Sequence, residues 1–198
     1  MSKLIIGIDE VGRGSLAGPV AVTALIMPKN LRVRSEKLPK LRDSKHLSVN
    51  QRNKIYDYLR AHPKISYVTA RALPKTIDRI NISRAANEAA TRAFNKLVIS
   101  QRLNVKSLKV YLDGGLYVKR NFQLGTCNFR TLIRGDLKIN AIKLASIAAK
   151  VTRDRYMVKL HKKYPKYGFD VHKGYGTKKH LRAIKKYGPC EVHRLTFV

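Results

Sequence analysis

The chain has 198 residues, of which 42 are lysine or arginine and 12 are aspartate or glutamate, so its formal net charge is +30 at pH 7. This length fits one domain with a buried core, and no apolar run approaches the ~20 residues of a membrane span. So large a basic excess indicates a polyanionic partner, most commonly nucleic acid, although a merely solvated basic surface is the alternative. Phosphate contacts are blind to bases, so the charge predicts no sequence specificity.

The sequence pattern of the N-terminal third predicts a β-hairpin followed by a helix. Apolar residues over 4–8 predict a first strand, a glycine-rich loop covers 10–18, and the run over 19–27 predicts an antiparallel second strand. The apolar start is interrupted at Asp9, which argues against a signal peptide. After a basic connector, Ser48 to Gln51 match a capping box that opens a helix.

The rest of the chain alternates strands and helices. In order, the sequence predicts a strand over 65–73, a helix over 76–102 with Asp78 capping its start, a strand over 108–112, a strand near 128–133 and a helix over about 142–163. In the last of these helices one face is expected to carry Leu144, Ile147, Ala148, Val151 and Arg155. The tail over 164–198 predicts loops and one short helix over 180–187. This order favours a mixed α/β sheet with helices packed on it.

Acidic residues are few, and four of them, at three sites in the sequence, stand out. Asp9 and Glu10 end the first strand, Asp113 ends the strand over 108–112, and Asp136 follows a glycine at a strand-to-helix transition. Carboxylates at the ends of neighbouring strands can converge at one sheet edge, where they suit Mg²⁺ or Mn²⁺ and the hydrolysis of a phosphodiester. A lone aspartate there is more often a turn former, but adjacent carboxylates repel without a cation.

The glycine-rich loop over 12–18 has the spacing GxGxxxG. Pro19 and a second strand follow where a dinucleotide-binding motif needs a helix, so that motif is not predicted. The loop is better suited to bring backbone amides close to a phosphate or sugar, with Arg13 adding charge, and a plain hairpin loop remains the alternative. The histidines match no zinc motif, and Cys127 and Cys190 indicate reduced thiols of a cytosolic protein.

Together these residues resemble the bacterial ribonuclease HII family of type 2 ribonucleases H. The matching segments, in family order, are GIDEVGRGSLAGPV (7–20), LRDSKHLS (41–48), YLDGG (111–115), RGD (134–136), LASIAAKVTRDRYM (144–157), YGFDVHKGYGT (167–177) and YGPCEVHRLTF (187–197). The resemblance implies an α/β ribonuclease H-like fold, with a five-stranded mixed sheet flanked by helices and a small helical C-terminal segment. It also implies a single catalytic domain over 1–198, in which residues from about 165 to 198 contact the substrate.

The resemblance implies a metal-dependent endonuclease. The expected substrates are the RNA strand of RNA–DNA hybrids and single ribonucleotides embedded in duplex DNA, which are incised on the 5′ side to leave 3′-hydroxyl and 5′-phosphate ends. Mn²⁺ or Mg²⁺ is the expected cofactor, with two ions during catalysis. A monomeric cytoplasmic protein without a membrane partner is expected.

The family's functional residues carry over to this sequence residue by residue. The resemblance assigns catalysis and metal binding to Asp9, Glu10, Asp113 and Asp136, and substrate binding to Gly12, Arg13, Gly14, Ser44, Lys45 and Tyr175. Three positions depart from the family pattern: His46 replaces a lysine, Leu144 replaces an alanine, and Ala141 stands where many members carry a glutamate near the second metal. A non-catalytic RNA-binding protein and a DNA resolvase of the same fold remain the rival hypotheses.

Overall fold

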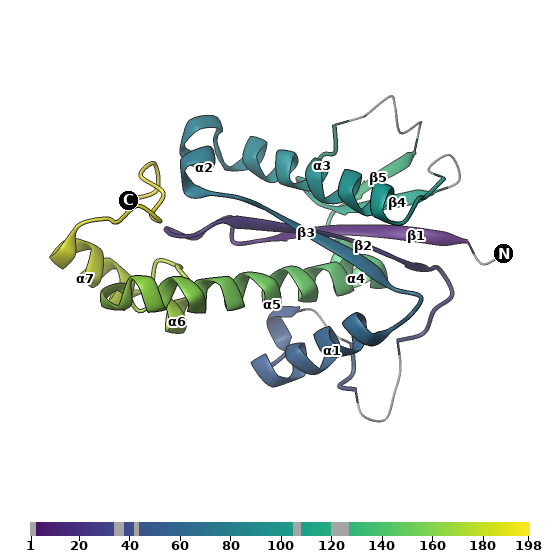
Figure 1. The fold of residues 1–198 in the computed structure, drawn as a ribbon, viewed down its shortest axis with the longest axis horizontal. Helices are drawn as coiled ribbons and strands as arrows, with labels where there is room; N and C mark the ends of the chain where they lie inside the picture. The colour runs from purple at the N-terminus through teal and green to yellow at the C-terminus, as the bar shows by residue number, and fades with distance from the viewer. Residues whose placement is uncertain (1–2, 34–37, 42–43, 105–107, 120–126) are drawn as a thin grey trace.

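The fold is centred on a five-stranded mixed sheet. The computed structural model describes residues 3–33, 38–41, 44–104, 108–119 and 127–198. The strands are β1 (Leu4–Val11), β2 (Val20–Pro28), β3 (Ser66–Ala72), β4 (Lys109–Asp113) and β5 (Asn128–Leu132). Their order across the sheet is β3-β2-β1-β4-β5, in which β1 to β3 are antiparallel neighbours while β4 runs parallel to both β1 and β5 (Figure 1). The mixed sheet with flanking helices that the sequence predicts is confirmed.

Helices cover both faces of this sheet (Figure 1). On one face lie α2 (Pro74–Ile80) and α3 (Ile82–Ser100), and on the other lie α1 (Val49–Ala61), α4 (Gly135–Lys138) and α5 (Asn140–Lys163). Side chains alternate between the faces along β1, so Ile6 and Ile8 join the α3-side core while Ile5 joins the α5-side core. This alternation decides on which side of the sheet each acidic residue at the end of β1 lies.

The backbones of β1 and α5 come into direct contact at Gly7. A Cβ atom at Gly7 would lie 2.2 Å from the carbonyl carbon of Ala141 and 2.3 Å from the amide nitrogen of Ile142. Only glycine permits this approach, because any side chain would push the helix away from the strand. The contact fixes the distance between the carboxyl end of β1 and the helix that faces it.

Several element boundaries differ from the sequence prediction. The predicted helix over 76–102 is two helices, because Asn81 has a φ of 64° and its side chain accepts a hydrogen bond from the Arg84 amide as the cap of α3. Asp78 lies inside α2 rather than at a helix start, and its carboxylate accepts hydrogen bonds from the amides of Leu195 and Thr196. Strand β1 also continues to Val11, past the predicted end. The capping box at Ser48 is confirmed.

The C-terminal segment contains more helix than the sequence predicts. A 3₁₀ turn (Pro165–Tyr167) and α6 (Phe169–His172) precede α7 (Lys178–Tyr187), which contains the predicted helix. Phe169 and Tyr167 pack with Met157 of α5 and Ala17 of the glycine-rich loop in a third apolar cluster. The segment is thereby attached to the loop that follows β1. No helix within the described ranges is long and apolar enough to cross a membrane.

Candidate active site

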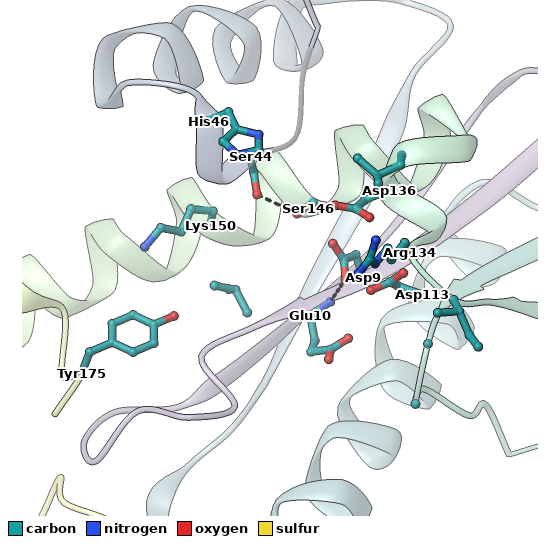
Figure 2. Close-up of a pocket in the computed structure, with 15 residues that line it drawn as sticks. Asp9, Glu10, Ser44, His46, Asp113, Arg134, Asp136, Ser146, Lys150 and Tyr175 are labelled. Carbon is teal, nitrogen blue, oxygen red and sulfur yellow. Dashed lines mark hydrogen bonds between the residues drawn. The ribbon is translucent and has the colours of Figure 1, made fainter.

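A cavity of about 810 Å³ opens at the carboxyl end of β1 and β4. All four acids predicted as catalytic line it, and Figure 2 shows them with the other polar lining residues. Beside Asp9, Glu10, Asp113 and Asp136, the polar part of the lining comprises Ser44, His46, Arg134, Ser146, Lys150 and Tyr175. Of the predicted substrate-binding residues, Ser44 and Tyr175 line the cavity. Lys45 lies in the 3₁₀ turn Ser44–His46, and its side chain is outside the described part of the structure.

Asp9 and Asp113 lie on neighbouring parallel strands and on the same face of the sheet. The ladder between β1 and β4 pairs Ile8 with Leu112, so the next residue of each strand is an aspartate. Tyr111 on β4 and Ile5 on β1 both pack in the α5-side core. Because every second side chain of a strand points to the same face, Asp113 and Asp9 point to that face as well. The parallel pairing therefore brings two of the four predicted carboxylates, those of Asp9 and Asp113, to one face of the sheet.

Glu10 points to the other face of the sheet, toward α3. Figure 2 shows the Asp9 and Glu10 carboxylates on opposite sides of β1. The Glu10 carboxylate lies 3.6 Å from the guanidinium of Arg13, which donates a 3.0 Å hydrogen bond to the Ser83 hydroxyl of α3. In this structure Arg13 is thus a counter-charge to Glu10 at the start of the glycine-rich loop.

Asp136 reaches the cavity through a tight turn between β5 and α4. Arg134 has a φ of 54°, and the Gly135 amide donates a 2.7 Å hydrogen bond to the Asp113 carboxylate. A Cβ atom at Gly135 would lie 2.5 Å from the Cδ1 atom of Ile142, so glycine allows this packing. Because Asp136 is the next residue, the turn links the position of the fourth acid to Asp113.

Ser146 of α5 is a site residue that the sequence analysis missed. Its buried hydroxyl forms a 2.9 Å hydrogen bond with that of Ser44 and also hydrogen-bonds the Asp9 carboxylate. Ser44 lines the cavity directly and is also linked to Asp9 through Ser146. Lys150, one turn further along α5, also lines the cavity, and its ammonium group forms a 2.9 Å ion pair with Asp154. No local sequence signal distinguishes these residues from the remainder of a buried helix.

Ala141, which stands where many family members carry a glutamate, is not part of the cavity lining. Its side chain is fully buried in the α5-side core, where its backbone contacts Gly7. A glutamate at this position would be buried beside the β1 backbone.

The protein's own basic groups neutralise the negative charge of the site only in part. Burial, together with the charges of Glu10 and Asp113, raises the pKa of Asp9 well above its usual range. Burial also raises the pKa of Glu10 to about 7, although the Arg13 guanidinium opposes this shift. One Glu10 carboxylate oxygen, Oε2, is buried without a hydrogen-bond partner. Such carboxylates favour a bound cation.

The donor set fits a hard divalent ion by its chemistry. Four carboxylates line one cavity, and oxygen ligands of this kind suit Mg²⁺ or Mn²⁺. Within the described ranges no three histidine, cysteine, aspartate or glutamate side chains already form a metal-binding cluster. Ion binding therefore requires the carboxylates to turn toward one another, which their mutual repulsion opposes until a cation is present.

The raised pKa of Glu10 predicts a pH-dependent stability in cation-free buffer. Its ordinary value is 4.5 and its value in the fold is about 7, so the folded state holds this proton more tightly than the unfolded chain does. The resulting stabilisation is complete below a pH of about 4.5 and is lost as the pH rises through 7. By pH 8 the loss in the free energy of unfolding amounts to roughly 3 kcal/mol. We expect Glu10→Gln to retain the stability that the wild type loses over this interval.

Chemical unfolding of both proteins at pH 5 and pH 8 measures this difference. The comparison with Glu10→Gln separates the carboxyl from other titrating groups. Mn²⁺ should stabilise the wild type more at pH 8 than at pH 5, because protons compete with the metal for the carboxylates. An equal loss of stability in the two proteins between pH 5 and pH 8 would contradict the assignment.

The glycine-rich loop is paired along its backbone with two parts of the C-terminal segment. Ser15 bridges Tyr175, and Ala17 bridges His193. The amides of Leu16 and Gly18 donate 2.8 Å hydrogen bonds to the carbonyls of Gly174 and Val192. The structure thus brings the loop that contains Gly12, Arg13 and Gly14 beside Tyr175.

The fold and site together define a class of nuclease. Ribonuclease H2 from Pyrococcus horikoshii OT3 superposes with a TM-score of 0.73 at 26% sequence identity, covering 98% of this chain and 93% of that one. A manganese complex of Bst-RNase HIII shares the fold with a TM-score of 0.66 at 19% identity, covering 100% of this chain and 68% of that one. The architecture is therefore that of a type 2 ribonuclease H.

Sequence comparison identifies the family. The model of the Ribonuclease HII family matches residues 6–198. Ribonuclease HII of Caldicellulosiruptor bescii is 41% identical over 196 residues, which cover 99% of this chain and 87% of that protein. The chain belongs to the ribonuclease HII family and is an endoribonuclease of the ribonuclease H type.

Proposed function

We propose that this protein hydrolyses the RNA strand of RNA–DNA hybrids and incises duplex DNA on the 5′ side of single embedded ribonucleotides, leaving 3′-hydroxyl and 5′-phosphate ends. The observation that carries the proposal is the shared cavity. A chain with only 12 acidic residues against 42 basic ones places four carboxylates in it, beside Tyr175 and close to the glycine-rich loop. A non-catalytic RNA-binding surface would gain nothing from carboxylates that repel phosphate.

We assign metal binding to Asp9, Glu10, Asp113 and Asp136. Mn²⁺ or Mg²⁺ is the proposed cofactor, with two ions during catalysis, and support comes from the carboxylate donor set and from the manganese complex of the Bst-RNase HIII relative. When bound, these ions would supply an activated water and charge stabilisation for the leaving oxygen. The carboxylates hold the ions, and Ser146 orients Asp9 by its hydrogen bond.

The basic residues and the glycine-rich loop are proposed to bind the substrate. Lys150 contributes positive charge at the cavity where a phosphate would lie. The backbone of Gly12, Arg13 and Gly14, together with the Tyr175 hydroxyl, is proposed to meet the ribose 2′-hydroxyl, the group that distinguishes RNA from DNA. Ser44 and Lys45 are proposed to lie near the nucleic-acid backbone.

We further propose that residues 1–198 form one catalytic domain that acts as a cytoplasmic monomer. Support for a reducing compartment comes from Cys127 and Cys190, which are both free thiols. Binding should weaken steeply with salt, because a chain of net charge +30 releases counterions when it contacts phosphates.

Incubation of the purified protein with two duplexes of one sequence, an RNA–DNA hybrid and an all-DNA duplex, tests the reaction class. An RNA–DNA hybrid should be cut in the presence of Mn²⁺ and left intact without it, while an all-DNA duplex should remain intact in both cases. Binding of the hybrid without metal-dependent cleavage would support the RNA-binding alternative instead. Cleavage of the all-DNA duplex would support a resolvase-like enzyme.

A further inference from the structure

Two arginines of the C-terminal half lie fully buried behind the glycine-rich loop. Arg153 of α5 and Arg194 near the C-terminus are both 0% exposed. None of the ion pairs found between described residues involves either of them. Burial, with the neighbouring Arg153, lowers the pKa of Arg194 to about 9. Two positive charges therefore stand close together, and the charges of Asp154 and Asp78 act on Arg153 and Arg194, respectively, without forming an ion pair.

Their hydrogen bonds go to the carbonyl groups of the loop. The guanidinium of Arg194 donates to the carbonyls of Gly12, Arg13 and Gly18 at 2.6, 2.7 and 3.0 Å. The planar fork of an arginine can bond three acceptors in this way, whereas a lysine ammonium offers no such fixed geometry. Arg194 thus determines which way the first residues of the loop face.

Arg153 extends the same arrangement to the Tyr175 segment. It donates to the carbonyls of Pro19, Ala17 and Lys173 at 2.9, 3.2 and 2.9 Å. Its guanidinium carbon lies 5.4 Å from the centre of the Tyr175 ring. One side chain therefore connects the loop after β1 to the segment that carries the tyrosine.

The hydrogen bonds to the loop carbonyls also determine the direction in which the loop N–H groups point. In a trans peptide the C=O group and the following N–H group point in opposite directions, and no peptide bond among the described residues is cis. Because the carbonyls of Gly12 and Arg13 face the buried Arg194, the N–H groups of Arg13 and Gly14 face away from it. A Cβ atom added at Gly14 would meet nothing within 4 Å, so this side of the loop is open.

We infer that Arg194 and Arg153 are positioning residues for ribose recognition. They hold the loop carbonyls inward, so that the amides of Arg13 and Gly14 form an outward pair of donors beside Tyr175. Their positive charge also favours a phosphate at the open face of the loop. This inference rests on the proposed function, because it concerns how that function selects a ribonucleotide.

The variant Arg194→Lys, which keeps the charge but loses the fork, tests the inference. Its matched control is Arg60→Lys, at an exposed position on α1. Binding of a duplex with one ribonucleotide and of the same all-DNA duplex is measured in metal-free buffer, and cleavage of the former is measured with Mn²⁺. In Arg194→Lys we expect the preference for the ribonucleotide duplex to fall toward one and cleavage to fall about 10–100-fold. Affinity for the all-DNA duplex should stay within about twofold, as phosphate contacts persist.

A purely structural role predicts a different outcome. In that case Arg194→Lys would melt at a lower temperature but keep the wild-type preference and cleavage rate, which would overturn the inference while leaving the proposed function intact. If the wild type itself neither prefers nor cuts the ribonucleotide duplex, the proposed function fails and this inference fails with it.

A measurement on the wild type covers the case in which Arg194→Lys does not fold. The amide NMR signals of Arg13 and Gly14 should shift when the ribonucleotide duplex is added, and should shift less with the all-DNA duplex. Equal shifts with both duplexes, or none with either, would overturn the assignment of these amides as ribose donors.

Discussion

Replacing Asp9 or Asp113 by asparagine should reduce cleavage of an RNA–DNA hybrid by at least about 100-fold. Loss of an outer-shell partner of a metal ligand already costs about 10–100-fold, so loss of a ligand should cost no less. Hybrid binding should persist within about threefold, because each substitution removes a negative charge from a surface that faces phosphate. Steady-state cleavage with Mn²⁺ and metal-free binding measure the two effects separately.

The matched control is Asp57→Asn, an exposed acid on α1, which should keep wild-type cleavage. Asp9→Asn should also melt no lower than the wild type in metal-free buffer at pH 8, because it removes a buried carboxylate that its neighbours repel. Near wild-type cleavage by both Asp9→Asn and Asp113→Asn would remove the basis for the proposed site.

Gly7→Ala should destabilise the protein by roughly 3 kcal/mol or more. The new methyl group would lie 2.2 to 2.5 Å from backbone atoms of Ala141 and Ile142, which cannot move independently of α5. Overpacking of this kind typically costs about 1–3 kcal/mol, and a contact with helix backbone belongs at the upper end. In a protein of this size the melting temperature should fall by roughly 6–12 °C.

Cleavage by Gly7→Ala should fall as well, since the displaced helix carries Ser146 away from Asp9. Gly14→Ala is the matched control for stability, because a methyl group there meets no atom within 4 Å and the position has no positive φ. Its melting temperature should stay within about 2 °C of the wild type. Equal melting temperatures for Gly7→Ala and the wild type would mean that β1 and α5 are not in backbone contact.

The position of the acids at strand ends was predictable, because that signal is local. Carboxylates after apolar strands mark strand ends, and parallel pairing of β1 with β4 then places Asp9 beside Asp113 on one face. The same alternation sends Glu10 to the opposite face, which the sequence analysis did not anticipate when it treated the two acids as one adjacent pair. Strand periodicity alone would have shown it.

The residues that α5 buries at the site could not be predicted from the periodicity of its apolar residues. The expected face of α5 included Arg155, which is exposed, while Ser146 and Arg153 are buried. Because α5 packs against the sheet on one side and against α6 and the loop on others, more than one stripe is buried. An amphipathic pattern identifies a single buried face and fails for a helix covered on several sides.

The histidine cluster of the C-terminal segment could not be predicted from the sequence either. His172, His180 and His193 match no sequence motif, yet His180 stacks on His172 with ring centres 4.3 Å apart and lies within 3.1 Å of the His193 ring nitrogen. Burial lowers the pKa of His180 to about 4, and its Nδ1 pairs with the Tyr175 carbonyl. Such a cluster depends on how three segments of the tail pack, which no local rule specifies.

The most direct test of the account is to map the cut in a duplex that contains one ribonucleotide. With Mn²⁺ the account predicts a single incision at the phosphodiester on the 5′ side of the ribose, which yields a 3′-hydroxyl and a 5′-phosphate, and no product from Asp113→Asn. A cut on the 3′ side, scattered cuts in the DNA strand, or no cut in the wild type would contradict it.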